Sequence, residues 1–215
     1  MYQYVLFDLD GTLTDSAEGI VNSVVHALNK RGLPVPEQET LLKFVGPPLL
    51  DSFQRYCGMT REEGMQGITD YREYFTDRGW CENLVYEGIP ELLQKLKAAG
   101  KTLIVATSKP EVFAKRIVEH FGLAEYFSLV VGSTLDEKRT GKGQVIDLVI
   151  RTIGEEHCGE MVMVGDREHD VRGAKENGLP CIGVLYGYGS REELEQAGAA
   201  QICESVQELE NYLLG

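Results

Sequence analysis

The 215-residue chain contains no long apolar run and no basic leader segment. A membrane-spanning helix needs about 18 or more consecutive apolar residues, and no stretch approaches that length. The beginning of the chain also lacks the basic region, apolar segment and cleavage site of a secretory signal. We therefore expect a cytoplasmic protein that does not associate with membranes.

Basic residues are scarce relative to acidic ones, with 21 Lys and Arg against 34 Asp and Glu and a formal net charge of -13. Nucleic acids and anionic membranes are bound through broad basic surfaces, which this balance disfavours. The same net charge repels small anions. A bound anion must therefore be held by a few local positive groups, such as a metal ion, a lysine or a helix N-terminus.

Cysteine is also sparse, and no two cysteines form a Cys-x-x-Cys pair. An odd, scattered set favours reduced thiols packed in the protein over a disulfide framework or a zinc site. The chain shows no internal repeat or low-complexity tract, and its hydrophobic fraction of 43% is enough for a sizeable core. The five cysteines are Cys57, Cys81, Cys158, Cys181 and Cys203.

The most informative segment is an apolar stretch that leads into Asp8, Asp10 and Gly11. We expect a buried strand whose last residues reach the carboxyl edge of a sheet, where the chain turns at Gly11. Side chains two apart in a strand point the same way, so the two carboxylates should lie together with a hard cation between them. Asp8 is then suited to nucleophilic attack and Asp10 to proton transfer. The alternative is an edge strand followed by an acidic turn.

A second segment, residues 102–110, is an apolar strand that ends in Thr107, Ser108, Lys109 and Pro110. Proline suits the first turn of a helix, and a helix N-terminus binds anions. The hydroxyls and nearby N–H groups are therefore candidates for holding phosphate oxygens. The alternative for Ser108 is a helix N-cap.

A third segment places Lys142 between two glycines, ahead of an apolar pattern with helical spacing. A lysine here can neutralise a bound phosphoryl group as a point charge. Lys138 and Arg139 are close enough in the sequence to compete for that role.

A fourth segment, residues 161–165, is an apolar strand followed by Asp166 and Asp170. The two acids are four residues apart, at the expected start of a helix. They are candidates for binding metal, and the alternative for Asp170 is a first-turn carboxylate stabilised by the helix dipole.

The segment Asp8-Leu-Asp-Gly-Thr-Leu-Thr-Asp-Ser16 resembles the first motif of the haloacid dehalogenase (HAD) superfamily, and the other three segments resemble its second, third and fourth motifs in order. The resemblance spans Tyr4 to Ala174. It implies Mg²⁺ as cofactor, with Asp170 either a direct ligand or a partner that orients Lys142 or water. The implied roles are catalysis by Asp8, Asp10, Thr107 and Lys142, phosphate binding by Gly11, Thr107, Ser108 and Lys142, and metal binding by Asp8, Asp10, Asp166 and Asp170.

Strand and helix signals alternate from Gly88 onward, which predicts a parallel sheet covered by helices on both faces. Residues 15–86 show helical patterns only, and the resemblance implies that they form the small helical cap, called C1, inserted after the first strand. The expected fold is a Rossmann-like α/β core of residues 1–14 and 87–215 with a cap of residues 15–86. Strands are expected near 103–106, 129–131, 162–164 and 182–184.

The turn around Gly46 and Pro47 interrupts the helices of the expected cap. In related phosphatases a loop at this place faces the active site, so these two residues and Lys43 are candidates for substrate specificity. Lys109 is a further candidate, from the second motif.

Thr12 and Asp10 favour one reaction class within the superfamily. Haloacid dehalogenases lack the second aspartate, and β-phosphoglucomutases usually carry valine at position 12. We therefore expect a magnesium-dependent hydrolase of phosphate monoesters that acts on a small phosphorylated metabolite through an aspartyl-phosphate. The chain as a whole resembles phosphoglycolate phosphatase, which implies a similar activity. A 5'-nucleotidase, favoured by residues 183–190, a β-phosphoglucomutase-like phosphotransferase and a non-catalytic binding module remain alternatives. The protein is expected to be a monomer or a homodimer.

Overall fold

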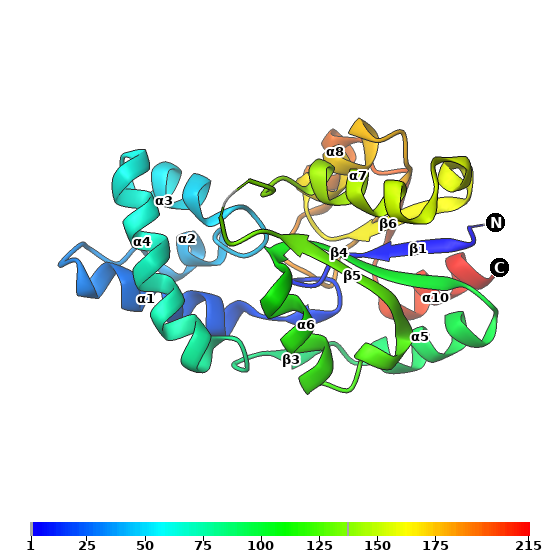
Figure 1. Ribbon diagram of the computed structural model, residues 1–215, viewed down its shortest axis with the longest axis horizontal. Coiled ribbons are helices and arrows are strands. Elements are labelled where there is room, and N and C mark those ends of the chain that lie inside the picture. The colour runs from blue at the N-terminus through cyan, green and yellow to red at the C-terminus, as the bar shows by residue number, and fades with distance from the viewer. Residues whose placement is uncertain (1, 137) are drawn as a thin grey trace. The chain divides into compact units, whose positions relative to one another are not determined.

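The computed structural model describes residues 2–136 and 138–215 and contains two compact units (Figure 1). The α/β unit comprises Met1–Thr14 and Val85–Gly215, and the helical unit comprises Asp15–Leu84. The second boundary therefore lies between Leu84 and Val85 rather than between residues 86 and 87. No helix in the described part of the chain is long and apolar enough to cross a bilayer.

The α/β unit is built on a six-stranded sheet in which every neighbouring pair of strands is parallel. Parallel strands buried on both faces need continuous apolar sequence. This requirement is met by β1, in which Val5, Leu6 and Phe7 are fully buried, and by β6, which is buried throughout. The predicted α/β fold class is confirmed. In the order β5-β4-β1-β6-β7-β8, the strands are Phe127–Ser133, Thr102–Pro110, Tyr4–Phe7, Met161–Gly165, Cys181–Val184 and Gln201–Cys203.

The register of the three central strands, β4, β1 and β6, aligns their carboxyl ends. Phe7 at the end of β1 is level with Val105 of β4 and Val164 of β6. The residues that follow these three positions therefore reach the same edge of the sheet.

Helices cover both faces of this sheet, with α7 and α8 on one face and α5 and α10 on the other (Figure 1). Leu6, Ile104 and Met163 of the sheet are fully buried in one core cluster with Val145 of α7. Each such side chain contributes about 1.5–3 kcal/mol through burial. The helices are α5 (Ile89–Ala98), α6 (Glu111–His120), α7 (Lys142–Ile153), α8 (Glu168–Glu176), α9 (Arg191–Ala197) and α10 (Val206–Leu214), with 3-10 turns η2 (Ala124–Tyr126) and η3 (Glu155–Glu160).

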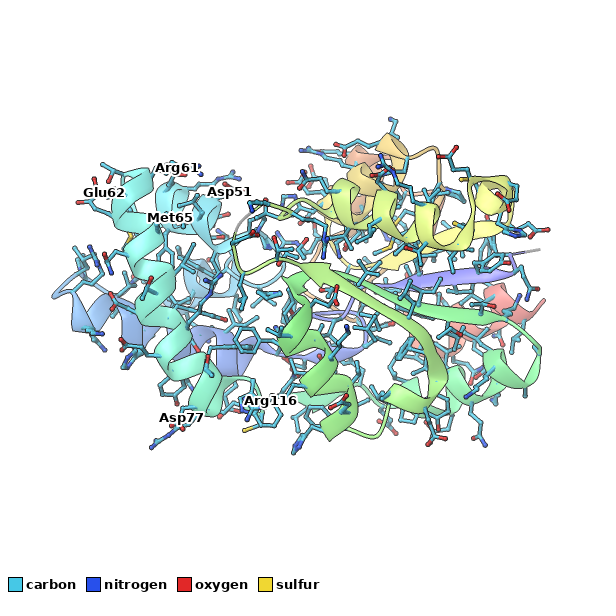
Figure 2. All side chains as sticks on the ribbon, in the orientation of Figure 1. Asp51, Arg61, Glu62, Met65, Asp77 and Arg116 are labelled. Carbon is cyan, nitrogen blue, oxygen red and sulfur yellow. The ribbon has the colours of Figure 1, made fainter. Side chains whose placement is uncertain are left out.

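The helical unit contains the helices that the apolar spacing predicts. Helix α4 begins with a capping box, in which Thr60 and Glu63 bond each other's backbone N–H groups. Figure 2 shows Arg61, Glu62 and Met65 in the first turns of this helix. The helices are α1 (Ala17–Lys30), α2 (Gln38–Leu42), α3 (Leu49–Cys57) and α4 (Arg61–Tyr74), followed by a π-helical turn η1 (Phe75–Gly79).

Two short strands add to this helical pattern, β2 (Thr14–Asp15) and β3 (Leu84–Val85), which form a separate two-stranded sheet. The expectation of helices alone for residues 15–86 was therefore incomplete. Strands of two residues are too short to produce a sequence period, which is why the pattern did not indicate them.

Asp70 joins α4 to the end of α1 inside the helical unit. Its buried carboxylate lies 2.9 Å from Lys30 Nζ and 3.4 Å from an Arg31 guanidinium nitrogen. Burial alone would raise the pKa of Asp70, but the hydrogen bonds from Lys30 and Arg31 outweigh burial and lower it. The ionised form is therefore the one that stabilises the packing of these helices.

We expect Asp70→Asn to lower the free energy of unfolding at pH 7 by about 2 kcal/mol. A lowered pKa in the folded state means that this contribution is present above the ordinary pKa of aspartate and is lost as the pH falls through the folded-state value. The difference between variant and wild type should therefore shrink toward zero in strong acid. Urea unfolding across this pH range measures it, and Asp77→Asn is the control because Asp77 is exposed and contacts the adjacent Arg78. A pH-independent difference would contradict the role of the charge.

Candidate active site

An acidic cluster lies at the carboxyl edge of the sheet, where β1 and β6 end. Asp8 follows β1 directly, and its N–H donates to the carbonyl of Val164 at 2.9 Å. Carboxylate oxygens of Asp8, Asp166 and Asp170 all lie within 4.8 Å of one another, and all three residues are buried. The structure thus brings together acids from two motifs more than 150 positions apart in the sequence.

Lys142 sits within this cluster. Its Nζ lies 2.8 Å from Asp8 Oδ1 and 2.8 Å from Asp170 Oδ1, and it donates to the carbonyl of Ala106 at 3.0 Å. The other two candidates are engaged elsewhere, since Lys138 pairs with Asp136 and the Arg139 side chain donates to the carbonyl of Gly132. Lys142 begins α7, so the start of the helix directs its ammonium group to the sheet edge.

Burial dominates the electrostatics of the cluster. It raises the pKa of Asp8 to about 6, although Lys142 pulls in the opposite direction. Burial also raises the pKa of Asp166 well above its ordinary value, and the neighbouring carboxylates of Asp170 and Asp8 raise it further. For Lys142, burial alone would lower the pKa, but the two carboxylates that it contacts raise it. Three buried acids with one ammonium group among them retain an excess of negative charge.

This donor set fits a hard divalent cation. Magnesium prefers carboxylate oxygens and water, and a cation among these acids offsets both their burial and their mutual repulsion, which raise the pKa values of Asp8 and Asp166. Asp8 and Asp166 lie at the ends of neighbouring strands, and Asp170 lies one helical turn beyond Asp166 in α8. Asp170 contacts Lys142 directly, so the structure is consistent with either role predicted for it, direct ligand or orienting partner.

Asp10 differs from the expectation that its side chain joins Asp8 around a cation. Among the described residues it lies outside the acidic cluster, and both of its oxygens accept from Lys109 Nζ, at 2.8 and 2.7 Å. The reason is that β1 ends at Phe7, so the two-residue alternation of a strand no longer sets side-chain direction at Asp10. The predicted specificity residue Lys109 is therefore the ion-pair partner of Asp10 here.

Thr107 and Ser108 lie inside β4, which continues to Pro110. The Thr107 hydroxyl is buried and accepts from the N–H of Lys109 at 3.2 Å. Pro110, not Ser108, occupies the N-cap position of α6, so the alternative of a Ser108 cap was wrong. The expected role of the two hydroxyls in phosphate binding stays a prediction.

Asp166 is enclosed by backbone that only glycine permits. Gly11 has a positive φ of 81°, and a Cβ there would collide with the Asp166 carboxylate. A Cβ at Gly187 or Gly189 would likewise collide with Asp166. Between these two glycines, the N–H of Tyr188 donates to Asp166 Oδ2 at 2.8 Å.

The contact between residues 187–189 and Asp166 was not predicted. From the sequence, residues 183–190 indicated a branch of the superfamily, not a backbone that holds Asp166. Thr12 is the residue by which the sequence favoured a phosphatase over a mutase. Its hydroxyl also lies near Asp166, at 3.4 Å from Oδ1.

The remaining specificity candidates lie in the helical unit. Lys43 ends α2 and forms an exposed ion pair with Glu39 at 3.3 Å. Gly46 has a positive φ of 99°, and Pro47 follows it in the connection to α3. Their part in substrate choice stays a prediction.

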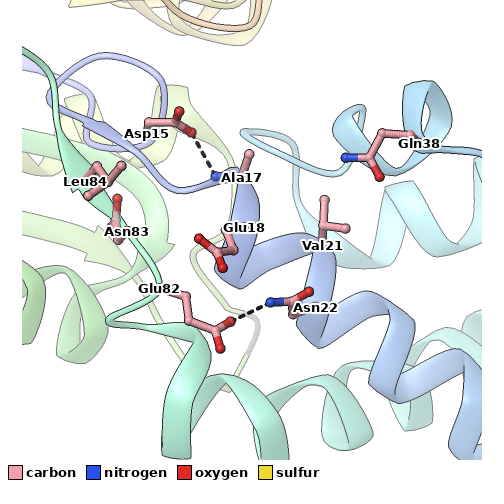
Figure 3. Close-up of a pocket in the computed structure, with 9 residues that line it drawn as sticks. All are labelled: Asp15, Ala17, Glu18, Val21, Asn22, Gln38, Glu82, Asn83 and Leu84. Carbon is pink, nitrogen blue, oxygen red and sulfur yellow. Dashed lines mark hydrogen bonds between the residues drawn. The ribbon is translucent and has the colours of Figure 1, made fainter.

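The helical unit also contains a cavity of about 370 Å³ near the start of α1 (Figure 3). Asn22 donates to Glu82 Oε2 at 2.8 Å, and the N–H of Ala17 donates to Asp15 Oδ1 at 3.2 Å. These bonds join α1 to the chain segments beside it. None of the predicted site residues lines this cavity.

Known proteins resemble the chain along almost its whole length. A 5'-nucleotidase of Pseudomonas aeruginosa is 44% identical over 99% of this chain and 96% of its own. Tyrosine-protein kinase PtkA of Mycobacterium tuberculosis is 41% identical over 95% of this chain and 69% of its own. A phosphoglycolate phosphatase of Yersinia pseudotuberculosis is 30% identical over 88% of this chain and 84% of its own.

Solved structures also resemble the chain along its whole length. The crystal structure of a predicted phosphatase from Clostridium acetobutylicum matches with a TM-score of 0.96 and 52% identity, over 100% of this chain and 99% of that one. The prediction of an HAD-like phosphatase is therefore confirmed at the level of family and enzyme class. The family model described as haloacid dehalogenase-like hydrolase matches residues 5–184, and this chain belongs to that family.

Proposed function

We propose that this protein is a magnesium-dependent phosphatase that hydrolyses phosphate monoesters of small metabolites through a phosphorylated Asp8. The observation that carries the proposal is the buried Asp8 carboxylate, held 2.8 Å from Lys142 and within the same cluster as Asp166 and Asp170. A carboxylate in this position has the charge neutralisation that phosphoryl transfer requires.

In the first step an oxygen of Asp8 attacks phosphorus, and the bond from phosphorus to the ester oxygen breaks. Asp10 donates a proton to the departing oxygen, which leaves as an alcohol. Lys142 offsets negative charge on Asp8 and on the phosphoryl oxygens, since its Nζ contacts the nucleophile directly. The products of this step are the free alcohol and the aspartyl-phosphate.

In the second step Asp10 accepts a proton from water, and that water attacks phosphorus. The bond between phosphorus and the Asp8 oxygen breaks, which releases orthophosphate and restores the free carboxylate. Asp10 is held by Lys109 in this structure. The Asp10 side chain must therefore turn away from Lys109 for each proton transfer.

Asp8, Asp166 and Asp170 are the residues that would hold Mg²⁺, with Tyr188 and Thr12 fixing the orientation of Asp166. The ion supplies further neutralisation of the phosphoryl oxygens. Residues 15–84 are proposed to act as the cap that contacts the leaving group and excludes water, with Lys43, Gly46 and Pro47 among the specificity residues.

Two substrate classes are the main candidates. 2-Phosphoglycolate is the substrate expected from the resemblance of the whole chain, and the phosphoglycolate phosphatase relative supports it. Nucleoside 5'-monophosphates are supported by the 5'-nucleotidase relative, which is more similar in sequence. Both are phosphate monoesters and need the same chemistry at Asp8.

Phosphate release from a panel of phosphate esters tests the proposal. We expect one preferred substrate among 2-phosphoglycolate, nucleoside 5'-monophosphates and sugar phosphates, with turnover abolished by EDTA and restored by Mg²⁺. Lys142 already pairs with the buried carboxylates of Asp8 and Asp170, so we expect circular dichroism to show a folded protein in EDTA. Undiminished release in EDTA would contradict the magnesium requirement. Absence of release from every ester by folded, Mg²⁺-loaded protein would favour the mutase or binding-module alternative.

A further inference from the structure

We infer that Glu193, on the first turn of α9, is a positioning residue for the metal-binding loop of residues 166–170. The inference rests on the proposed function, because it concerns the affinity of the acidic cluster for Mg²⁺. Glu193 belongs to none of the four motifs.

The Glu193 carboxylate reaches two donors in that loop. Its Oε1 accepts from Arg167 Nε at 2.8 Å and from the N–H of Glu168 at 2.9 Å. The two donors, the side chain of Arg167 and the backbone of Glu168, belong to the two residues that follow Asp166. One oxygen atom therefore anchors the loop at two consecutive residues.

The anchored segment connects the two acids that follow β6. The N–H of Arg167 donates to Asp170 Oδ2 at 3.1 Å, and Asp166 is held on its other side by the N–H of Tyr188. A shift of the backbone at residues 167 and 168 would therefore move Asp170 relative to Asp166. Partners that orient metal ligands in this way influence metal affinity strongly.

The local structure of α9 gives an independent reason to assign Glu193 a tertiary role. Glu193 occupies the third position after the cap residue Ser190, whose hydroxyl accepts the Glu193 N–H at 3.1 Å. A glutamate at this position usually bonds back to the cap residue, as Glu63 does with Thr60 in α4. Glu193 directs its carboxylate to the loop instead.

The arrangement around Arg167 makes this contact more than a surface ion pair. The side chains of Arg167 and Glu193 are 13% and 23% exposed, so water and salt screen their interaction only in part. The exposed Glu192, one residue earlier in the same helix, instead accepts a hydrogen bond from Gln196 within α9. The two glutamates thus form a matched pair for experiment.

Calorimetric titration of the substrate-free protein with Mg²⁺ tests the inference. We expect Glu193→Ala to weaken Mg²⁺ binding by roughly 10-fold or more. Glu193→Asp keeps the charge but shortens the side chain, so it should weaken binding to a similar degree. Glu193→Gln keeps an oxygen at the same reach and should stay within about 3-fold of wild type, as should the control Glu192→Ala.

The outcomes separate this inference from the proposed function. If wild type binds Mg²⁺ and folded Glu193→Asp binds it with the same affinity, the positioning role is overturned but the proposed magnesium chemistry is not. A loss in Glu193→Gln together with wild-type affinity in Glu193→Asp would show that charge rather than position matters, and would also overturn it. Absence of Mg²⁺ binding by wild type would overturn the proposed magnesium chemistry itself and this role with it. Thermal unfolding of each metal-free variant checks that the protein tested is folded.

Discussion

Asp8→Asn is expected to abolish multiple turnover while leaving the protein folded. The variant keeps the size of the side chain but cannot form the aspartyl-phosphate. Uncatalysed hydrolysis of phosphate monoesters is extremely slow, so the loss should exceed about 10⁴-fold on the preferred substrate. Steady-state phosphate release, with and without Mg²⁺, measures it.

The structure also predicts that Asp8→Asn remains folded. The raised pKa of Asp8 shows that its ionised form is disfavoured by burial, so a neutral amide should fit the site without large loss of stability. Asp147→Asn, on the exposed side of α7, is the control and should retain full activity. Substantial multiple turnover by purified Asp8→Asn would show that the covalent mechanism is wrong.

Lys142→Met is expected to have the second large effect, on both activity and stability. The change leaves Asp8 and Asp170 buried without the ammonium group that contacts both. Removing one partner from a buried ion pair costs about 3–5 kcal/mol because the remaining charge is left uncompensated. Urea unfolding in EDTA measures this loss, and phosphate release should fall with it.

Two further measurements make the Lys142 result specific. Lys138→Met removes an exposed lysine four residues earlier and should change the free energy of unfolding by less than about 0.5 kcal/mol. Addition of Mg²⁺ should recover part of the stability of Lys142→Met, since a cation can then offset the acids. Equal stability of Lys142→Met and wild type in EDTA would contradict the buried ion-pair arrangement.

The local patterns of the sequence were sufficient to predict most of the α/β unit. Short apolar segments predicted β1, β4, β5, β6 and β7, because continuous burial leaves a clear signal in a parallel strand. Strand β8 was not predicted. It has three residues, and of these only Cys203 is fully buried at the edge of the sheet, so its sequence carries almost no pattern.

The sequence by itself therefore determined the class of fold, the family and the two chain segments that supply the acidic cluster. These properties depend on residues that are neighbours in the chain, and hydrophobic periodicity and motif spacing report them directly.

Only the tertiary structure decided which side chains meet at the sheet edge. It selected Lys142 over Lys138 and Arg139, paired Asp10 with Lys109, and brought Tyr188 and Glu193 to the loop of residues 166–170. Each of these contacts joins segments from different strands or helices. Their formation depends on strand register and on backbone direction beyond the strand ends, and neither leaves a trace in the local sequence pattern.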